Sequence, residues 1–271
     1  MRIHKIKFSH FNPALTELYP AVLGNDYAMD WVKAERKKWH SYDEEIKSET
    51  SSILRCPGIF EMYSKGFFIQ QPYDISFTLK DNDIQVSTPD LMSLFDNNRV
   101  VGRQQNEVFF HKPNESAVMP LREGTLHNIA NIPTGFQLLS SVPLLLLPVP
   151  YPDQYEWEGS MGILETHKSV EVNLQAYLNN YKGEKEKTWK INAGDNILFA
   201  IPLTSDNWVI ENQLTIKEKI WIKTYNMAVS RSNFCPMKIA ANYSTILPVP
   251  PLTVRISQTF RITSFGEDHP V

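Results

Sequence analysis

Cysteine is scarce in this sequence. The 271 residues include only Cys56 and Cys235, which is too few for a disulfide framework and fits a reducing compartment. Each cysteine precedes a proline, and only Arg55, beside Cys56, would favour a reactive thiolate. We therefore expect two structural thiols. A chain of this length needs no disulfide or metal to hold its core.

Long apolar runs are also absent. The longest, VPLLLLPVP at 142–150, is interrupted by prolines and falls short of the ~20 apolar residues that span a bilayer. The N-terminal stretch MRIHKIKFSHF shows no apolar signal region. These features predict a protein without membrane partners, used in the cytosol or carried in an assembly formed there.

This sequence lacks the excess of positive charge that is typical of nucleic-acid-binding proteins. Lys and Arg number 27 against 30 Asp and Glu, a net charge of -3, so no basic field would attract a phosphate backbone. The cationic run ERKK at 35–38 is followed by acidic DEE at 43–45, as on a solvated helix face. The six tryptophans are spread without basic companions, which favours packing in a core or interface over base stacking.

Alternating apolar residues indicate strands along most of the chain. In 66–79 they predict one face formed by Phe68, Ile75, Phe77 and Leu79. Further strands are expected in 3–8, 82–88, 107–112, 132–150 (hinged at Pro143), 169–178, 188–203 and 253–263, with an exposed polar loop at 179–188. The best helix candidate is 26–50, with Asp26 as its cap. Residues 209–230 fit a helical stripe or an alternating strand, and we expect a helix over part of them.

These elements predict a mainly β protein. Short strands, 18 prolines and few helices favour a β-clip or jelly-roll-like distorted barrel, with one N-terminal helix packed on it and an extended C-terminal segment. We divide the chain into an N-terminal strand and helix (1–50), a β-rich barrel core (51–208) and a C-terminal extension (209–271), which combines a helix or strand with an extended arm.

Four stretches carry a family resemblance. They are RCPGIFEMYSKGFFIQQPYDI (55–75), IPTGFQLLSSVP (132–143), GILETHKSVEVNL (162–174) and INAGDNILFAIPL (191–203). In this order they resemble a family of mostly uncharacterised proteins of tailed bacteriophages, cyanophages among them, over roughly residues 30 to 208. The resemblance implies a virion component, or a factor acting in the bacterial host cytoplasm.

The last three stretches are also similar to the β-clip core of dUTPase-like proteins. In that superfamily a glycine-aspartate turn precedes one barrel strand, and an "I-x-x-G-D" turn opens the closing strand. A glycine permits such a tight turn, and an aspartate satisfies backbone N–H groups within it. These are architectural needs, so the resemblance implies a fold more strongly than an activity.

The residues that dUTPase chemistry would need are largely missing. Glu165 and His167 stand where the two turn aspartates would be. LLLL follows Pro143 where the resemblance implies a phosphate-holding arginine, and the tail SFGEDHPV has one glycine and no arginine. We therefore expect no nucleotide hydrolysis, although Glu165 could serve as a general base.

Metal and cofactor chemistry find little support in the sequence. None of the seven histidines has an acidic residue two positions later, as a two-His-one-carboxylate site would. His111 and His127 could still meet Glu165 across a barrel. No nucleophile elbow, phosphate loop, H-E-x-x-H or C-x-x-C motif occurs. We expect no cofactor and no metal.

The sequence thus favours a non-enzymatic phage structural or interaction protein, which contacts neighbouring copies or other phage proteins. A second hypothesis is a small-molecule enzyme or binder that uses the barrel mouth, with Glu165, His167 and His127 as candidate residues and a nucleotide as the first ligand to try. A third is a host-directed phage factor that binds a bacterial protein.

Overall fold

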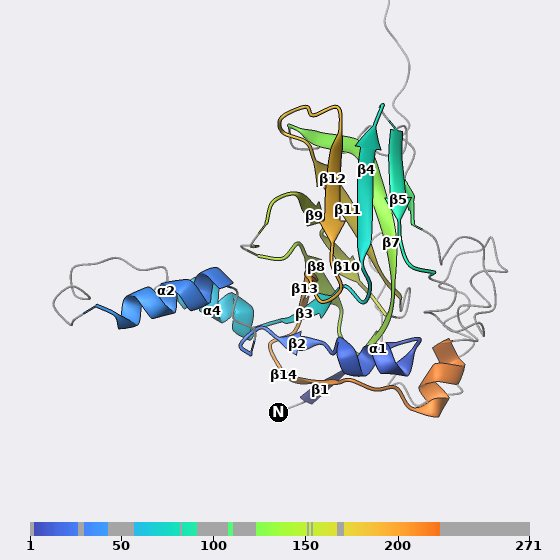
Figure 1. Cartoon of the computed structure of the whole chain (residues 1–271). Coiled ribbons are helices and arrows are strands. Elements are labelled where there is room, and N and C mark those ends of the chain that lie inside the picture. Colours follow the sequence, from blue (N-terminus) through green and yellow to red (C-terminus); the bar gives the residue numbers. More distant parts are fainter. Residues whose placement is uncertain are drawn as a thin grey trace, which may run out of the picture.

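The protein is mainly β, as predicted, and its strands form three sheets (Figure 1). The computed structural model describes residues 3–26, 30–42, 57–81, 83–90, 108–110, 123–150, 152, 154–166 and 171–222. The predictions for Cys56, for Cys235 and for the strand at 253–263 fall outside these residues.

Every pair of neighbouring strands is antiparallel except β1 and β14, which run parallel. Sheet A contains, in order, β14 (Asn207–Glu211), β1 (Ile3–His10), β7 (Thr125–Ser140), β11 (Glu171–Asn179) and β9 (Trp157–Gly159), with β6 (Phe109–Phe110) also paired to β7. Sheet B contains β10 (Gly162–Leu164), β8 (Leu144–Leu147), β13 (Asn196–Pro202), β3 (Phe67–Gln70) and β2 (Val22–Leu23). Sheet C contains β12 (Lys187–Ile191), β4 (Ile75–Lys80) and β5 (Asp83–Ser87).

One apolar core joins the three sheets. Phe8, Phe136 and Ile132 of sheet A, Phe67 of sheet B, and Trp189 of sheet C all belong to it and are at most 1% exposed. The rings of Phe8 and Phe136 stack with centroids 4.5 Å apart. Sheets that share one core in this way form a distorted sandwich.

The strands of the described chain do not close into a barrel, because they change sheets at corners, as in the distorted, jelly-roll-like arrangement that the sequence predicts. Between β3 and β4 the chain passes from sheet B to sheet C, and between β12 and β13 it returns. These two corners are hydrogen-bonded: the Gln71 N–H donates to the Asp195 carbonyl, and the Gly194 N–H donates to the Gln71 carbonyl, both at 2.8 Å. As predicted, the chain also turns at Pro143, so that β7 and β8 lie in different sheets.

The corner after β3 also corrects the predicted face of residues 66–79. Ile75, Phe77 and Leu79 of β4 point into the main core, as expected. Phe68 lies on the opposite side of sheet B, in a second cluster with Phe199. The period-two alternation is interrupted at 71–74, so it does not continue from β3 to β4.

Three labelled helices accompany the sheets: α1 (Pro13–Leu18), α2 (Asp30–His40) and α4 (Pro57–Ser64). The helix predicted at 26–50 is α2, and it begins four residues after Asp26, whose N–H closes a turn onto the Leu23 carbonyl. It does not pack on the sheets but lies away from them (Figure 1). The helix on sheet A is instead α1, whose Thr16 hydroxyl accepts from the His10 N–H at 2.8 Å.

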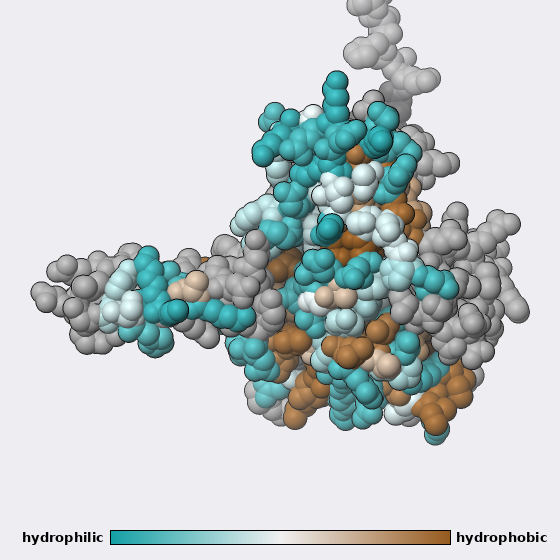
Figure 2. All heavy atoms as spheres, viewed as in Figure 1, coloured by the Kyte–Doolittle hydropathy of each residue, from teal (hydrophilic) through white to brown (hydrophobic). Residues whose placement is uncertain are grey.

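Within the segment 209–230, the described residues, which end at 222, are divided between the two structures that the pattern allows. Residues 207–211 form β14, and residues 216–222 are helical. The loop between β11 and β12 is largely exposed, as predicted, and Figure 2 shows hydrophilic residues gathered at that end of the molecule.

Candidate functional site

The structure separates two of the three residues expected at a barrel mouth. Glu165 is half-buried directly after β10, where Thr166 is bonded to Ser140 at the end of β7. His127 lies near the other end of β7, about 13 residues or roughly 40 Å along the strand. The side chain of His127, all of His167 and all of His111 lie outside the described part of the chain. The described backbone therefore does not bring position 127 to Glu165.

The turn after β10 differs from the dUTPase-like pattern. Gly162 is part of a strand, its φ is not positive, and a Cβ there would meet no atom within 4 Å. The fixed residue of this turn is Thr166, 7% exposed, whose hydroxyl donates to the Ser140 carbonyl at 2.8 Å and accepts from the Ser140 N–H at 3.3 Å. Its role is to attach the turn to sheet A.

The turn before β13 has the glycine and aspartate roles that its own residues predict. Gly194 has φ +89°, in the region that favours glycine. The Asp195 carboxylate accepts from the Asn192 N–H at 2.7 Å, as predicted for an aspartate in this turn. The Ala193 N–H donates to the Asp74 carboxylate at 2.8 Å, which fixes the turn against the neighbouring corner.

This turn borders a hollow of about 650 Å³ that is partly open to solvent. The buried tryptophans Trp157 of β9 and Trp189 of β12 line it. Tyr155 and Tyr181 also line it and are 68% and 58% exposed. A volume of this size is ordinary for a small-molecule site.

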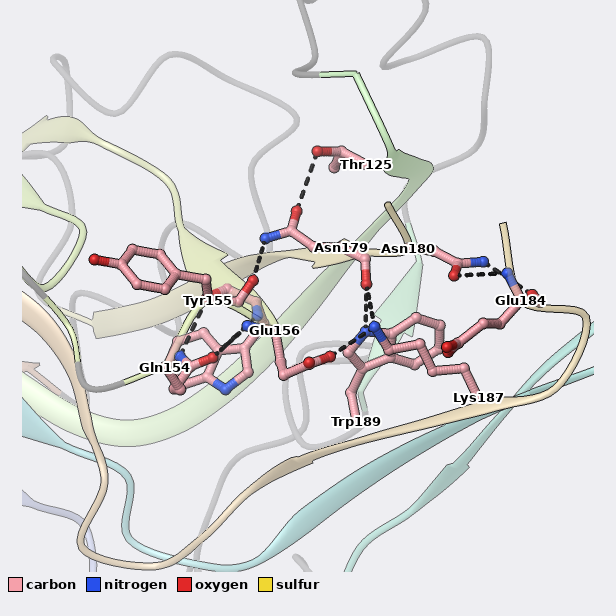
Figure 3. A network of polar contacts seen from close by, with 10 residues as sticks. Thr125, Gln154, Tyr155, Glu156, Asn179, Asn180, Glu184, Lys187 and Trp189 are labelled. Atoms are coloured by element: carbon pink, nitrogen blue, oxygen red, sulfur yellow. Dashed lines mark hydrogen bonds and ion pairs between the residues drawn. The ribbon is translucent and has the colours of Figure 1, made fainter. Parts of the chain in front are cut away.

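The wall of the hollow is held by a network centred on Asn179, at the end of β11 (Figure 3). The Asn179 carbonyl accepts from the Trp189 indole N–H at 2.8 Å and from the Lys187 ammonium at 2.9 Å. The Asn179 amide donates to the Tyr155 carbonyl at 2.8 Å, and its oxygen accepts from the Thr125 hydroxyl at 3.1 Å. One buried residue of β11 thus joins β7, β12 and the segment that leads into β9.

Three further contacts fix the segment that enters β9. The Gln154 side-chain oxygen accepts from the Glu156 N–H at 2.6 Å and from the Trp157 N–H at 3.3 Å. The Glu156 carboxylate pairs with the Lys187 ammonium at 2.6 Å. Because the wall is bonded before any ligand arrives, it is preorganised.

The second notable feature is apolar and lies on sheet B. The strand register aligns Ile163 of β10 with Leu145 of β8, and Leu145 with Ile201 of β13, so that the three side chains form a row across one face. Phe199, two residues before Ile201 in β13, lies on the same face, and Phe68 of β3 is aligned with Phe199. We call this the outer face of sheet B, because the alternate residues of the same strands enter the main core.

Helix α4 covers only one part of the outer face. Ile59 and Tyr63 of α4 pack on Phe68 and Phe199, and these four residues are buried. The Tyr63 hydroxyl donates to the Pro150 carbonyl at 3.0 Å. The row of Leu145, Ile163 and Ile201, which we call the open row, retains exposed surface: Ile201 packs at the border of the α4 cluster and is half-buried, as is Leu145, and Ile163 is 62% exposed.

Ion pairs fasten β14 and the residues after it to β1. The Lys5 ammonium bonds the Glu211 carboxylate at 2.6 Å, and this bond raises the pKa of Lys5 and lowers that of Glu211. Burial alone would raise the pKa of Glu218, but bonds from Lys7 and Thr215 outweigh it and lower that pKa. The cluster is adequately explained as a structural attachment.

Neither a catalytic nor a metal centre is evident among the described residues. No group of three or more His, Cys, Asp and Glu side chains in the described ranges is placed to hold a metal ion. Nor does any helix within those ranges have the length and apolar character to cross a membrane.

Comparisons with known proteins found no match to this chain among family models, curated proteins or solved structures.

Proposed function

We propose that this protein is a non-enzymatic structural or interaction protein, which binds a neighbouring protein chain through the outer face of sheet B. The observation that carries the proposal is the open row of Leu145, Ile163 and Ile201. Strands that are apolar on both faces belong to sheets covered on both sides. Here the chain's own α4 covers one side only in part.

The edge of sheet B next to this row supports the same proposal. Edge strands are usually protected from pairing by charged residues. Four of the other edge strands, β5, β9, β12 and β14, each carry at least one charged residue, whereas β10 has none, and neither do the two-residue edge strands β2 and β6. Met161, just before β10, is 71% exposed. An in-register apolar row beside an uncharged edge differs from the singly scattered apolar residues of ordinary surfaces.

The setting proposed for this interaction is a tailed-phage virion, where the neighbour is a second copy or another phage protein. It rests on the resemblance of the four sequence stretches and on the lack of a described catalytic constellation. Mass spectrometry of purified particles tests it. A host-directed factor would instead be found with a bacterial protein and be absent from particles.

Sedimentation velocity over a wide concentration range tests the surface. We expect the wild-type protein to associate, and Ile163→Glu to weaken association about tenfold or more, because a carboxylate would have to be desolvated in the contact. Ile216→Glu is the matched control, because Ile216 is 78% exposed and lies outside the outer face. A wild-type protein that stays monomeric and is absent from particles would overturn the proposal, and so would equal behaviour of the two variants.

A further inference from the structure

The two tyrosines at the hollow are exposed, yet the backbone around them is fixed. The Tyr155 carbonyl accepts from the Asn179 amide at 2.8 Å. Tyr181 lies against Gly124, where φ is +80° and a Cβ would come within 2.5 Å of the Tyr181 ring. The Asn180 N–H donates to the Gly124 carbonyl at 2.6 Å, which holds these two segments together. In Figure 3 the Tyr155 ring extends away from the Asn179 network.

Exposed, anchored tyrosines are typical of binding surfaces. A tyrosine has two rotatable side-chain bonds, so it offers a large contact area at a low cost in conformational entropy. Its ring provides an apolar face, and its hydroxyl can both donate and accept a hydrogen bond. These properties fit a ligand with an apolar face and a polar rim.

The polar groups of the hollow are mixed donors and acceptors. Thr188 contributes a hydroxyl, Asn192 an amide and Lys190 an ammonium group. Such a set fits a ligand that carries several hydroxyl groups, each of which both donates and accepts. The Thr188 hydroxyl also contacts the Thr78 hydroxyl at 3.3 Å, and the Asn192 amide donates to the Asp195 carboxylate at 3.2 Å, so each has one partner within the protein. A purely apolar ligand is a poorer match, because it would displace the water that satisfies the remaining hydrogen-bonding capacity of these groups.

The charges disfavour an anionic ligand. Glu156, Glu158 and Asp195 line the hollow, against one lining cation, Lys190. A nucleotide would therefore meet net negative charge. A cationic ligand would gain little from two of these three carboxylates, because Glu156 already pairs with Lys187 and Asp195 already accepts from the Asn192 N–H.

We infer that this hollow binds a neutral saccharide. The C–H face of a sugar ring would pack on Tyr155 and Tyr181, and its hydroxyls would bond the polar groups between them. Asn179 is a positioning residue, because it fixes the Tyr155 backbone and both β12 side chains without being exposed itself.

The test begins with the full-length protein on an array of neutral glycans that covers the common hexose and N-acetylhexosamine linkages. The strongest binder is then titrated by calorimetry. We expect Tyr155→Ala and Tyr181→Ala each to weaken binding about tenfold or more. Tyr155→Phe, which keeps the ring, should bind within about threefold of wild type. Thermal melting of every variant verifies that the fold is kept.

Controls separate this inference from the proposed function. Phe109→Ala removes an exposed aromatic side chain that does not line the hollow, and Ile163→Glu alters the outer face, so both should leave glycan binding unchanged. The inference fails if no neutral glycan is retained, or if binding persists in both alanine variants. It also fails if the protein binds oligolysine or a nucleoside triphosphate at this hollow in preference to glycans.

Discussion

The two faces of sheet B are built from the same residue types and have different surroundings. On the inner face, Leu144 and Leu164 are aligned and belong to the core shared with sheets A and C. On the outer face, Phe68 and Phe199 lie under α4, while Ile163 in the open row is 62% exposed. An apolar strand therefore shows that both of its faces need covering, but it does not show whether the cover is the chain itself or a partner.

A substitution on the inner face should have the largest effect on the free energy of unfolding. Leu144 is fully buried, so Leu144→Ala removes buried surface and leaves a cavity. We expect the free energy of unfolding to fall by about 2–5 kcal/mol, measured by urea denaturation. A loss below about 1 kcal/mol would mean that the inner face is not the packed core described here.

A second prediction for the main core concerns Tyr73 and applies only at high pH. Burial raises the pKa of Tyr73, whose hydroxyl donates to the Pro133 carbonyl at 2.6 Å. An unfolded tyrosine ionises near pH 10. The unfolded state therefore loses this proton first, and stability should decline as pH rises above about 10. Urea midpoints across that range should fall less steeply in Tyr73→Phe; identical pH slopes would contradict this reasoning.

The covered part of the outer face should show a smaller effect. Tyr63→Phe keeps the ring against Phe199 and removes the hydrogen bond to the Pro150 carbonyl. We expect a loss of about 0.5–1.5 kcal/mol, again by urea denaturation. No loss would indicate that α4 is held by its apolar contacts alone.

The open row should show the smallest effect on stability. Ile163→Ala should change the free energy of unfolding by no more than about 0.5 kcal/mol, because most of this side chain is already in water. A loss as large as that of Leu144→Ala would mean that Ile163 supports the fold of the single chain and is not reserved for a partner.

The sequence predicted local features well. Gly194 and Asp195 form the expected turn, β4 alternates as expected, and Pro143 separates two strands. Turn chemistry and the two-residue period are local properties, which explains this success. The four leucines at 144–147 form β8, within the strand expected after Pro143.

The candidate site was much less predictable. Whether His127 could meet Glu165 depended on the 16-residue length of β7, which local alternation did not reveal. Asn179 is part of a polar run that the sequence assigns to a loop, and its contacts come from β7, β12 and the segment before β9. Tyr155 and Tyr181 are 26 positions apart, and the folded sheets bring both to one hollow.

The most direct test of the account places a photo-crosslinking amino acid at position 163, and in a matched sample at position 216. Both are exposed in the single chain, but only position 163 belongs to the open row. In associated protein or assembled particles, we predict crosslinks from position 163 to a second copy or another phage protein, well above those from position 216. Equal yields at the two positions, or none at position 163, would contradict the claim that the outer face of sheet B binds a neighbouring chain.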